Sequence, residues 1–272
     1  MTDHLLKPNR AEQEGGRFLS RRASFGLMGG GALATIAALA GCGSDSAGPN
    51  GGGATINGLT RAAVQSAFGD IQKDEDNHVI YLTTAIPAKG GTARPAPTFD
   101  TTQPVWNPTT ASQLYELAVA LENTGTGAYV YATRYLASDP DVLVAGASIG
   151  LVEGRHAGFL NILTSRPILT DPTPGQNDRT DPTGKTFLTL PFGIADKAQE
   201  VPQAPSTVVQ RAQPFLVNVQ LNGGPPPPPD DFSGQGNPLV AVLNYALLLE
   251  YLEKTWYDRN VPKYLAGQLG TA

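Results

Sequence analysis

The chain has 272 residues, 40% of them hydrophobic, and a formal net charge of −5, so it is long enough for one sizeable core or two small ones. Its single cysteine excludes an internal disulfide and any metal site built from several cysteines. No basic run lies beyond the first 42 residues, so nucleic acid is not an expected partner.

Residues 1–42 have the features of a targeting signal rather than of a folded segment. Residues 20–25, Ser-Arg-Arg-Ala-Ser-Phe, resemble a twin-arginine export signal, and an apolar, glycine-rich stretch follows to Ala40. Residues 39–42, Leu-Ala-Gly-Cys, resemble a bacterial lipobox, in which the cysteine is lipidated; a stray thiol is the alternative. We therefore expect an exported protein of the cell envelope, held by lipid on Cys42 at the periplasmic or outer side of the membrane. Residues 43–59 would form its flexible tether.

Four helices are predicted, at about 60–86, 110–136, 141–163 and 238–259, from apolar residues spaced three and four apart. The second and third are separated by a short turn, which makes them antiparallel neighbours. Residues 87–109 contain five prolines and should be an extended connection. Residues 165–236 are rich in proline and glycine and should wrap outside the helices as irregular chain, with a short helix at about 207–217.

The strongest chemical signal is a repeated Glu-x-x-His spacing, Glu75 with His78 and Glu153 with His156, which uses both histidines beyond the targeting segment. Residues three apart in a helix project from the same face, and each pair lies on an apolar stripe. Either pair alone is more typical of a solvated surface. Because an unpaired buried charge is costly, the repetition favours a bound metal ion.

Two further glutamates, Glu122 and Glu250, lie in the middle of the apolar faces of the second and fourth helices. Glu116 and Glu253 lie off or far from the ligand stripe and are predicted to be exposed. Asp74 is predicted either to orient an imidazole or to be an ordinary solvated residue.

These residues resemble the motifs of ferritin-like proteins. Glu250 with Tyr257 seven residues later is similar to the first helix of ferritins and bacterioferritins, and Glu122 with Tyr129 is similar to the third. The two Glu-x-x-His pairs resemble the second and fourth helices. Residues 152–156 and 244–253 are most similar to the plant desiccation-related proteins and their exported bacterial homologues.

The resemblance implies an all-α, ferritin-like four-helix bundle in residues 60–272, with the irregular insertion between the third and fourth helices. The helix that resembles the family's first one comes last, so the order is that of a circular permutation. This order leaves open whether Glu250 completes its own chain's site or that of a neighbour in a homodimer.

The resemblance also implies a site for two divalent ions, iron or manganese. Its expected ligands are two bridging and four terminal residues: Glu75 and Glu153 as bridges, with His78, Glu122, His156 and Glu250 as terminal ligands. Such a protein would oxidise ferrous iron or consume peroxide, with a metal ion or a small-molecule oxidant as its partner. Tyr129 and Tyr257 would then be redox-active, catalytic residues; core tyrosines with hydrogen-bonded hydroxyls are the alternative. A catalytically idle envelope or stress-protection protein is the competing functional interpretation.

Overall fold

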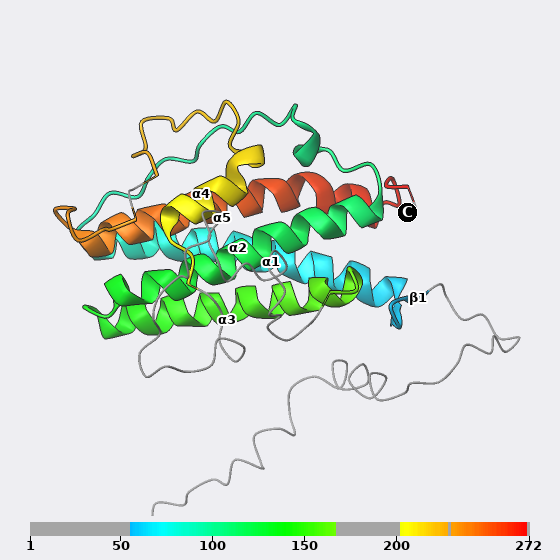
Figure 1. Ribbon diagram of the computed structural model, residues 1–272, viewed down its shortest axis with the longest axis horizontal. Helices are drawn as coiled ribbons and strands as arrows, with labels where there is room; N and C mark the ends of the chain where they lie inside the picture. Colours follow the sequence, from blue (N-terminus) through cyan, green and yellow to red (C-terminus); the bar gives the residue numbers. More distant parts are fainter. Residues whose placement is uncertain (1–54, 167–201, 228–229, 271–272) are drawn as a thin grey trace, which may run out of the picture. The chain divides into compact units, whose positions relative to one another are not determined.

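The structure, a computed structural model, describes residues 55–166, 202–227 and 230–270. Four long helices form a bundle: α1 (Arg61–Ala88), α2 (Ala111–Leu136), α3 (Pro140–Leu163) and α5 (Pro238–Leu265) (Figure 1). The all-α prediction is confirmed, and most helix ends lie within two residues of the predicted ones. The exception is α5, which continues to Leu265 because the Ala266 amide still reaches the carbonyl of Pro262, at 3.0 Å.

Each long helix begins at a residue whose side chain accepts a hydrogen bond from a backbone amide of the first turn, which satisfies a donor that the helix itself leaves unpaired. These N-terminal residues are Thr60, Thr110, Asp139 and Asn237. Pro140 and Pro238 follow the last two, at the first helical position, where a proline needs no amide donor.

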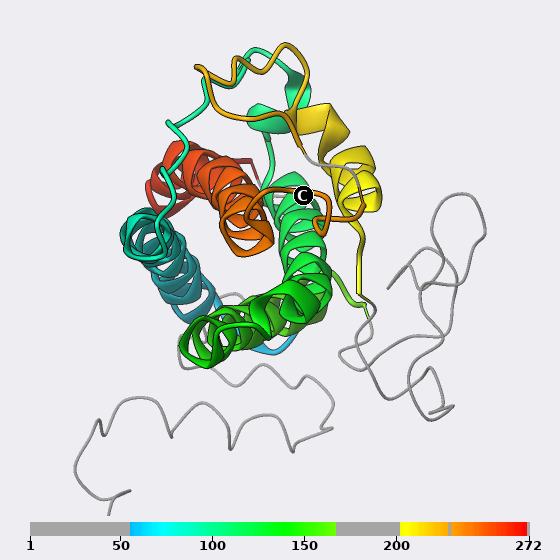
Figure 2. The same cartoon turned by 90° about the vertical axis from the view of Figure 1, so that its left-hand side faces the viewer.

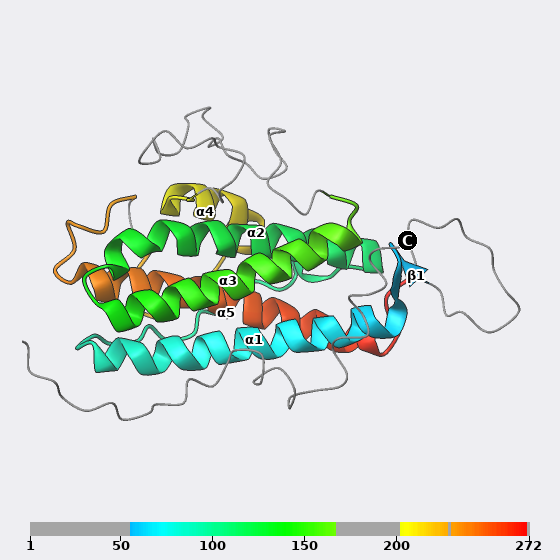
Figure 3. The same ribbon diagram turned by 90° about the horizontal axis from the view of Figure 1, so that it is seen from below.

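Neighbouring helices of the bundle run antiparallel, and α1 and α2, on one diagonal, run parallel (Figures 2 and 3). The connection between α1 and α2 therefore returns along the length of the bundle over α5, and it contains the short 3-10 helix η2 (Pro104–Trp106). Side chains of α5 hold this connection in place. The Asn244 side chain accepts a hydrogen bond from the Arg94 amide at 2.7 Å, and the Trp256 indole donates to the carbonyl of Val105 at 2.8 Å.

A two-stranded hairpin, β1 (Thr55–Ile56) and β2 (Leu59–Thr60), precedes α1. Its turn residues, Asn57 and Gly58, both have positive φ, at 49° and 82°, as a two-residue hairpin turn requires. The Asn57 side chain donates to the carbonyls of Ile162 and Leu163 at the end of α3. The last residues of the predicted tether, 55–59, thus belong to a hairpin that caps a bundle helix.

The described part of the insertion contains α4 (Pro205–Ala212) and η5 (Gln213–Phe215), close to the short helix predicted at 207–217. Residues 202–204 lead into α4 across α2. The Gln203 amide donates to the carbonyl of Gly127 at 2.9 Å, and a Cβ on Gly127 would lie only 2.4 Å from the Gln203 side chain. Glycine at position 127 therefore permits the close approach of this segment to α2.

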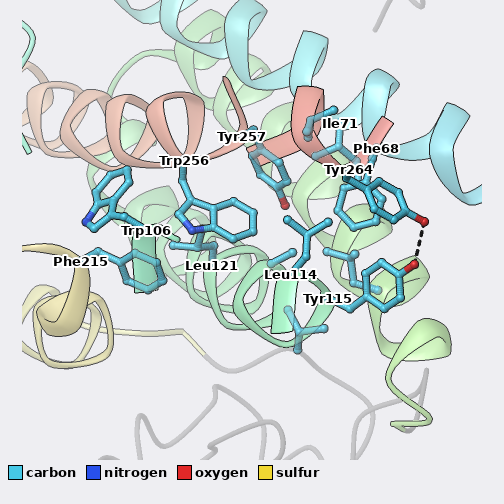
Figure 4. Packing of buried hydrophobic residues seen from close by; sticks show 14 of the residues in the cluster. Phe68, Ile71, Trp106, Leu114, Tyr115, Leu121, Phe215, Trp256, Tyr257 and Tyr264 are labelled. Carbon is cyan, nitrogen blue, oxygen red and sulfur yellow. Dashed lines mark hydrogen bonds between the residues drawn. The ribbon is translucent and has the colours of Figure 1, made fainter. Parts of the chain in front are cut away.

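The interior consists of two apolar clusters separated along the bundle. One is rich in aromatic residues and is shown in Figure 4, where the hydroxyls of Tyr115 and Tyr264 are hydrogen-bonded at 2.7 Å. The other surrounds Leu82, Leu136 and Leu247 at the opposite end. All four long helices contribute to both clusters, so the residues between the clusters face a common space in the bundle interior. None of the described helices has the length and apolar character needed to cross a membrane.

Candidate metal centre

The space between the two apolar clusters contains the six residues that the sequence singles out as metal ligands. Their exposed fractions range from 0% for Glu75 to 8% for His156. The centre draws on all four long helices, with a Glu-x-x-His pair from each of α1 and α3 and one glutamate from each of α2 and α5. The six side chains are Glu75, His78, Glu122, Glu153, His156 and Glu250.

One half of the centre is organised around His78. Its Nδ1 atom lies 3.2 Å from each of three carboxylate oxygens, Oε2 of Glu75, Oε1 of Glu153 and Oε2 of Glu250. The atoms that these four residues offer to a metal all lie within 4.8 Å of one another. Glu250, the residue from the last helix, therefore lies beside the other predicted ligands of its own chain.

The other half is organised around His156. Its Nδ1 atom lies 3.1 Å from Oε2 of Glu122 and 3.3 Å from Oε1 of Glu75. These residues and Glu153 again offer ligand atoms within 4.8 Å of one another. Glu75 and Glu153 belong to both groups, and Glu75 presents one oxygen to each histidine. The arrangement is that of two adjacent cation positions with two carboxylates in common.

Tyr129 and Tyr257 bind the two glutamates that are not shared between the groups, Glu250 in the first group and Glu122 in the second. The hydroxyl of Tyr129 on α2 donates to Oε1 of Glu250 on α5, and the hydroxyl of Tyr257 on α5 donates to Oε1 of Glu122 on α2. Each bond leaves the second carboxylate oxygen, Oε2, facing a histidine. Both tyrosines are buried and are placed to orient the two glutamates.

A family model described as a ferritin-like domain matches residues 33–166, which include the whole of α1, α2 and α3. The match covers three of the four helices that supply the two ligand groups. The fold is a ferritin-like bundle. The matched range contains five of the six predicted ligands, and Glu250 on α5 lies beyond its end. No curated protein and no solved structure gives a significant match to the chain.

Asp74 lies at the edge of the centre and contacts the ring of one ligand, His156. Its Oδ2 atom lies 3.2 Å from Nε2 of His156, and its side chain is 45% exposed. A hydrogen bond from Nε2 to this carboxylate selects the imidazole tautomer whose Nδ1 atom is free to bind a metal. Of the two predictions for Asp74, the structure supports the one in which it orients an imidazole, and that imidazole is on a different helix.

Burial and mutual repulsion raise the pKa values of carboxyl groups in the centre. Burial, and then the charge of Glu122, raise the pKa of Glu75 to about 7, against the lowering effect of its contacts with the two histidines. Burial and the charges of Glu75 and Glu122 also raise the pKa of Glu153. These shifts express the cost of holding several anionic groups together away from water.

The pKa values of the two histidines are raised as well, but by the neighbouring carboxylates and against the effect of burial. Burial lowers the pKa of His156, but the charge and contacts of Glu122 and Glu75 outweigh it and raise that pKa to about 11. Burial likewise lowers the pKa of His78, and its carboxylate contacts raise it by more. Without an ion, the imidazolium groups supply the positive charge that the glutamates need.

The oxygens of the shared glutamates show that cations fit this donor set. Oε1 of Glu75 and Oε1 of Glu153 are fully buried and lie 3.3 and 3.2 Å from a histidine Nδ1 atom without the geometry of a hydrogen bond, and the buried Oε2 of Glu153 also accepts none. Buried acceptors in folded proteins are nearly always satisfied, so orphaned carboxylate oxygens are a reason to expect a missing partner. A cation between the helices would satisfy these oxygens.

One prediction about this region is wrong. Glu253 was expected to be exposed, yet it is 3% exposed and lies in the interior one turn after Glu250. The reason is Gly125 on α2, where a Cβ would come within 3.2 Å of Oε1 of Glu253 and 2.6 Å of Oε2 of Glu153. The glycine leaves room for both carboxylates. Glu116, in contrast, is exposed as predicted and pairs with Arg166 at 2.5 Å.

The burial of Glu253 has a partial signal in the sequence. Glu253 lies between Leu252 and Trp256 on a stretch of α5 whose apolar positions are almost all buried, and it is spaced from Glu250 as neighbours on one helix face are. The decisive signal, Gly125, lies 128 positions away in the chain on a different helix. Periodicity within α5 alone does not reveal that partner.

Proposed function

We propose that this protein binds two divalent ions, iron or manganese, between its four long helices and uses them to oxidise ferrous iron or to consume peroxide. The observation that carries the proposal is the pair of buried ligand groups that share Glu75 and Glu153. Two positions with common carboxylates hold two ions side by side, as in two-metal sites with separations of roughly 3.5–4 Å.

The donor set favours this metal class. Four glutamates balance the charge of two divalent ions, and each position has one imidazole nitrogen among carboxylate oxygens. Mixed nitrogen and oxygen ligands suit iron and manganese; zinc binds such sites as well but has no redox chemistry. Two redox-active ions side by side, when bound, supply a two-electron exchange with dioxygen or peroxide.

The protein's own residues prepare the site for that chemistry. The Tyr129 and Tyr257 hydroxyls hold Glu250 and Glu122, so these ligands are oriented before an ion binds. Asp74 lies 3.2 Å from Nε2 of His156, where its carboxylate can accept the Nε2 proton and so leave Nδ1 for an ion. The apolar clusters at both ends exclude bulk water, which strengthens every charge interaction between them.

The first test is the metal content of the protein isolated from its native envelope, followed by assays of the metal-loaded protein with ferrous iron and with peroxide. The proposal expects about two ions per chain. It also expects turnover that is lost in His78→Ala and His156→Ala, with the helices retained. Glu116→Gln, which changes an exposed glutamate, is the control and should behave as the unaltered protein does. A protein that holds no metal refutes the proposal. Metal without turnover would leave the idle, stress-protection interpretation.

We also propose that the protein is exported by the twin-arginine route and anchored through lipid on Cys42. This rests on the sequence, since Cys42 lies outside the described residues. Mass spectrometry of the mature N-terminus tests it, and an intact N-terminal extension or an unmodified Cys42 would contradict it.

We further propose that the chain is related to the desiccation-related proteins and that its helix order is circularly permuted, with the family's first helix placed last. It is supported by α5, which is last in the chain and supplies Glu250 and Tyr257 to the centre. An alignment of the family tests the permutation. It would support the permutation if Glu250 and Tyr257 align with a helix of the relatives that comes before the helix aligned with Glu75.

A further inference from the structure

A cavity of about 240 Å³ lies at the end of the bundle where α1 and α2 begin and α5 ends. Its walls come from β1, from the first residues of α1 and α2, and from the last residues of α3 and α5 with the chain that follows α5. None of the six predicted metal ligands lines it. The cavity is therefore separate from the metal centre, and its own lining decides what it can bind.

The chain after α5 folds back and forms one wall of this cavity. Gly267 has a positive φ of 67°, which lets the chain reverse direction after the helix. The Gly270 amide then donates to the carbonyl of Thr109 at 2.9 Å, and the Ala111 amide donates to the carbonyl of Gly270 at 3.0 Å. These two backbone hydrogen bonds hold residues 267–270 against the start of α2, so this wall of the cavity has a fixed position.

Two buried tyrosines from different helices line the cavity. Tyr115 on α2 and Tyr264 on α5 are 5% and 4% exposed, and their hydroxyl oxygens lie 2.7 Å apart (Figure 4). One hydroxyl donates in such a pair and the other accepts, so the proton of the accepting hydroxyl is left over. No further hydrogen bond to either hydroxyl occurs among the described residues. Because buried donors nearly always have an acceptor, the spare proton indicates an acceptor supplied by a ligand in the cavity.

The residues beside the tyrosine pair make the cavity positive. Arg61, the first residue of α1, lines the cavity, and within the described ranges its guanidinium has no ion pair or hydrogen bond. Ala111 and Ser112, the first two residues of α2, place a second helix N-terminus there. Helix N-termini carry a partial positive charge, and neither helix has an acidic residue in its first turn to offset it. The described lining contains no acidic side chain, so the acceptor that fits best is an anion.

The rest of the lining favours an anion with an apolar body. Ile56, Leu163 and Leu269 supply hydrocarbon surface beside the polar groups. A volume of about 240 Å³ lies below the roughly 300–1,000 Å³ of pockets for drug-sized ligands, so the ligand must be small. A free phosphate ion would accept from the donors but would leave the apolar walls in contact with water.

We propose that this cavity binds a small carboxylic acid with a single ring or a short alkyl chain. A carboxylate oxygen accepts the spare proton of the Tyr115–Tyr264 pair, and the carboxylate charge pairs with Arg61. The ring or chain packs against Leu163 and Leu269. The inference goes beyond the proposed function and does not depend on it, because the cavity shares no residue with the two ligand groups of the metal centre.

Binding of benzoate tests the inference, with benzamide as an uncharged probe of the same shape. Calorimetric titration of the protein should give one benzoate per chain, and benzamide should bind at least about tenfold more weakly. Arg61→Gln should weaken benzoate binding by about 10–100-fold, as expected for the loss of a hydrogen bond to a charged group. Lys73→Gln is the matched control, because it removes an exposed positive charge of the same helix that does not line the cavity. Its benzoate affinity should equal that of the unaltered protein.

The hydroxyl pair provides a second arm of the experiment. The double variant Tyr115→Phe with Tyr264→Phe removes both hydroxyls together and leaves no buried donor unpaired, so it should fold. Its affinity for benzoate should fall about tenfold. Ser112→Leu enlarges a side chain of the lining and should also weaken binding, whereas Ala62→Leu, at an exposed position outside the lining, should not.

Treatment with a chelator separates this cavity from the metal centre. Benzoate affinity should be the same before and after the treatment, and its loss would place the carboxylate on bound metal and overturn the inference. Equal affinities for benzamide and benzoate would overturn the choice of an anion. Unchanged benzoate binding in both Arg61→Gln and the double tyrosine variant would show that the ligand binds elsewhere. Binding of inorganic phosphate in place of benzoate would overturn the need for an apolar body. A protein that binds no benzoate refutes the inference and leaves the proposed metal centre unaffected.

Discussion

Tyr257 on α5 donates a hydrogen bond to Glu122 on α2, and this contact links the aromatic cluster to the candidate metal centre. The hydroxyl occupies one carboxylate oxygen, and the other oxygen, Oε2, faces His156 at 3.1 Å. The orientation of Glu122 therefore depends on a residue from another helix. The same relationship between Tyr129 and Glu250 makes α2 and α5 depend on each other.

Tyr257→Phe should lower the stability of the protein by about 1–3 kcal/mol, because it leaves a buried carboxylate oxygen without its donor. It should also weaken the binding of one of the two ions, since Glu122 loses its fixed orientation. Chemical denaturation and metal titration measure the two effects. Tyr264→Phe is the control, because it removes a hydroxyl bonded to Tyr115 in the same cluster without touching a predicted ligand. Equal metal affinity in the two variants would show that Tyr257 does not position the site.

Asp74→Asn should reduce the affinity of one metal position by roughly 10–100-fold, the range found for residues that orient a ligand imidazole. The cause would be a less constrained His156 ring, whose Nε2 atom loses its carboxylate partner. Titration with Co²⁺ followed by absorption spectroscopy measures the affinity of the two positions. Asp70→Asn is the matched control on the same helix, since Asp70 is exposed and pairs only with Lys73 among the described residues. A similar loss in both variants would point to a general charge effect.

The stability of the metal-free protein should fall as the pH rises from about 4.5 to 7. The pKa of Glu75 is about 7 in the folded chain and 4.5 in the unfolded one, so between these values the folded state holds a proton that the unfolded state has lost. His156 acts in the same direction, because its pKa rises from 6.5 to about 11, and its contribution is complete below pH 6.5 and lost through pH 11.

Denaturation of the metal-free protein at a series of pH values tests this expectation. Glu75→Gln should flatten the slope between pH 4.5 and 7, because it removes the group that titrates there. Metal affinity should show the opposite trend and rise over the same range, since each ion displaces protons from its ligands. A stability that increases with pH in the metal-free protein would contradict the assignment.

Removal of bound metal should lower the melting temperature without unfolding the bundle. An ion present at 100 times its dissociation constant stabilises the folded state by about 2.7 kcal/mol, and its removal forfeits that amount. The two apolar clusters and the histidine–carboxylate contacts remain, so the helical circular dichroism signal should persist. Calorimetry before and after treatment with a chelator gives the shift. Glu153→Gln, at a shared ligand, should show a smaller shift than the unaltered protein.

The sequence by itself determined the helices and the chemistry that they carry. Apolar residues at spacings of three and four located the four long helices, because one face of each must be buried against its neighbours. The same periodicity identified Glu75, His78, Glu153 and His156, since polar residues on an apolar stripe need a partner. These inferences depend on residues of a single helix, where the backbone geometry sets which side chains are adjacent.

Only the tertiary structure decided the relationships between helices. It placed Glu250 in its own chain's group, directed Asp74 to His156 rather than to His78 of its own helix, and buried Glu253. The burial of Glu253 depends on Gly125, which belongs to a helix that is distant in the chain and adjacent in space. Whether a carboxylate is exposed or buried is thus set by the volume left by side chains on facing helices, and periodicity within one helix carries no record of that volume.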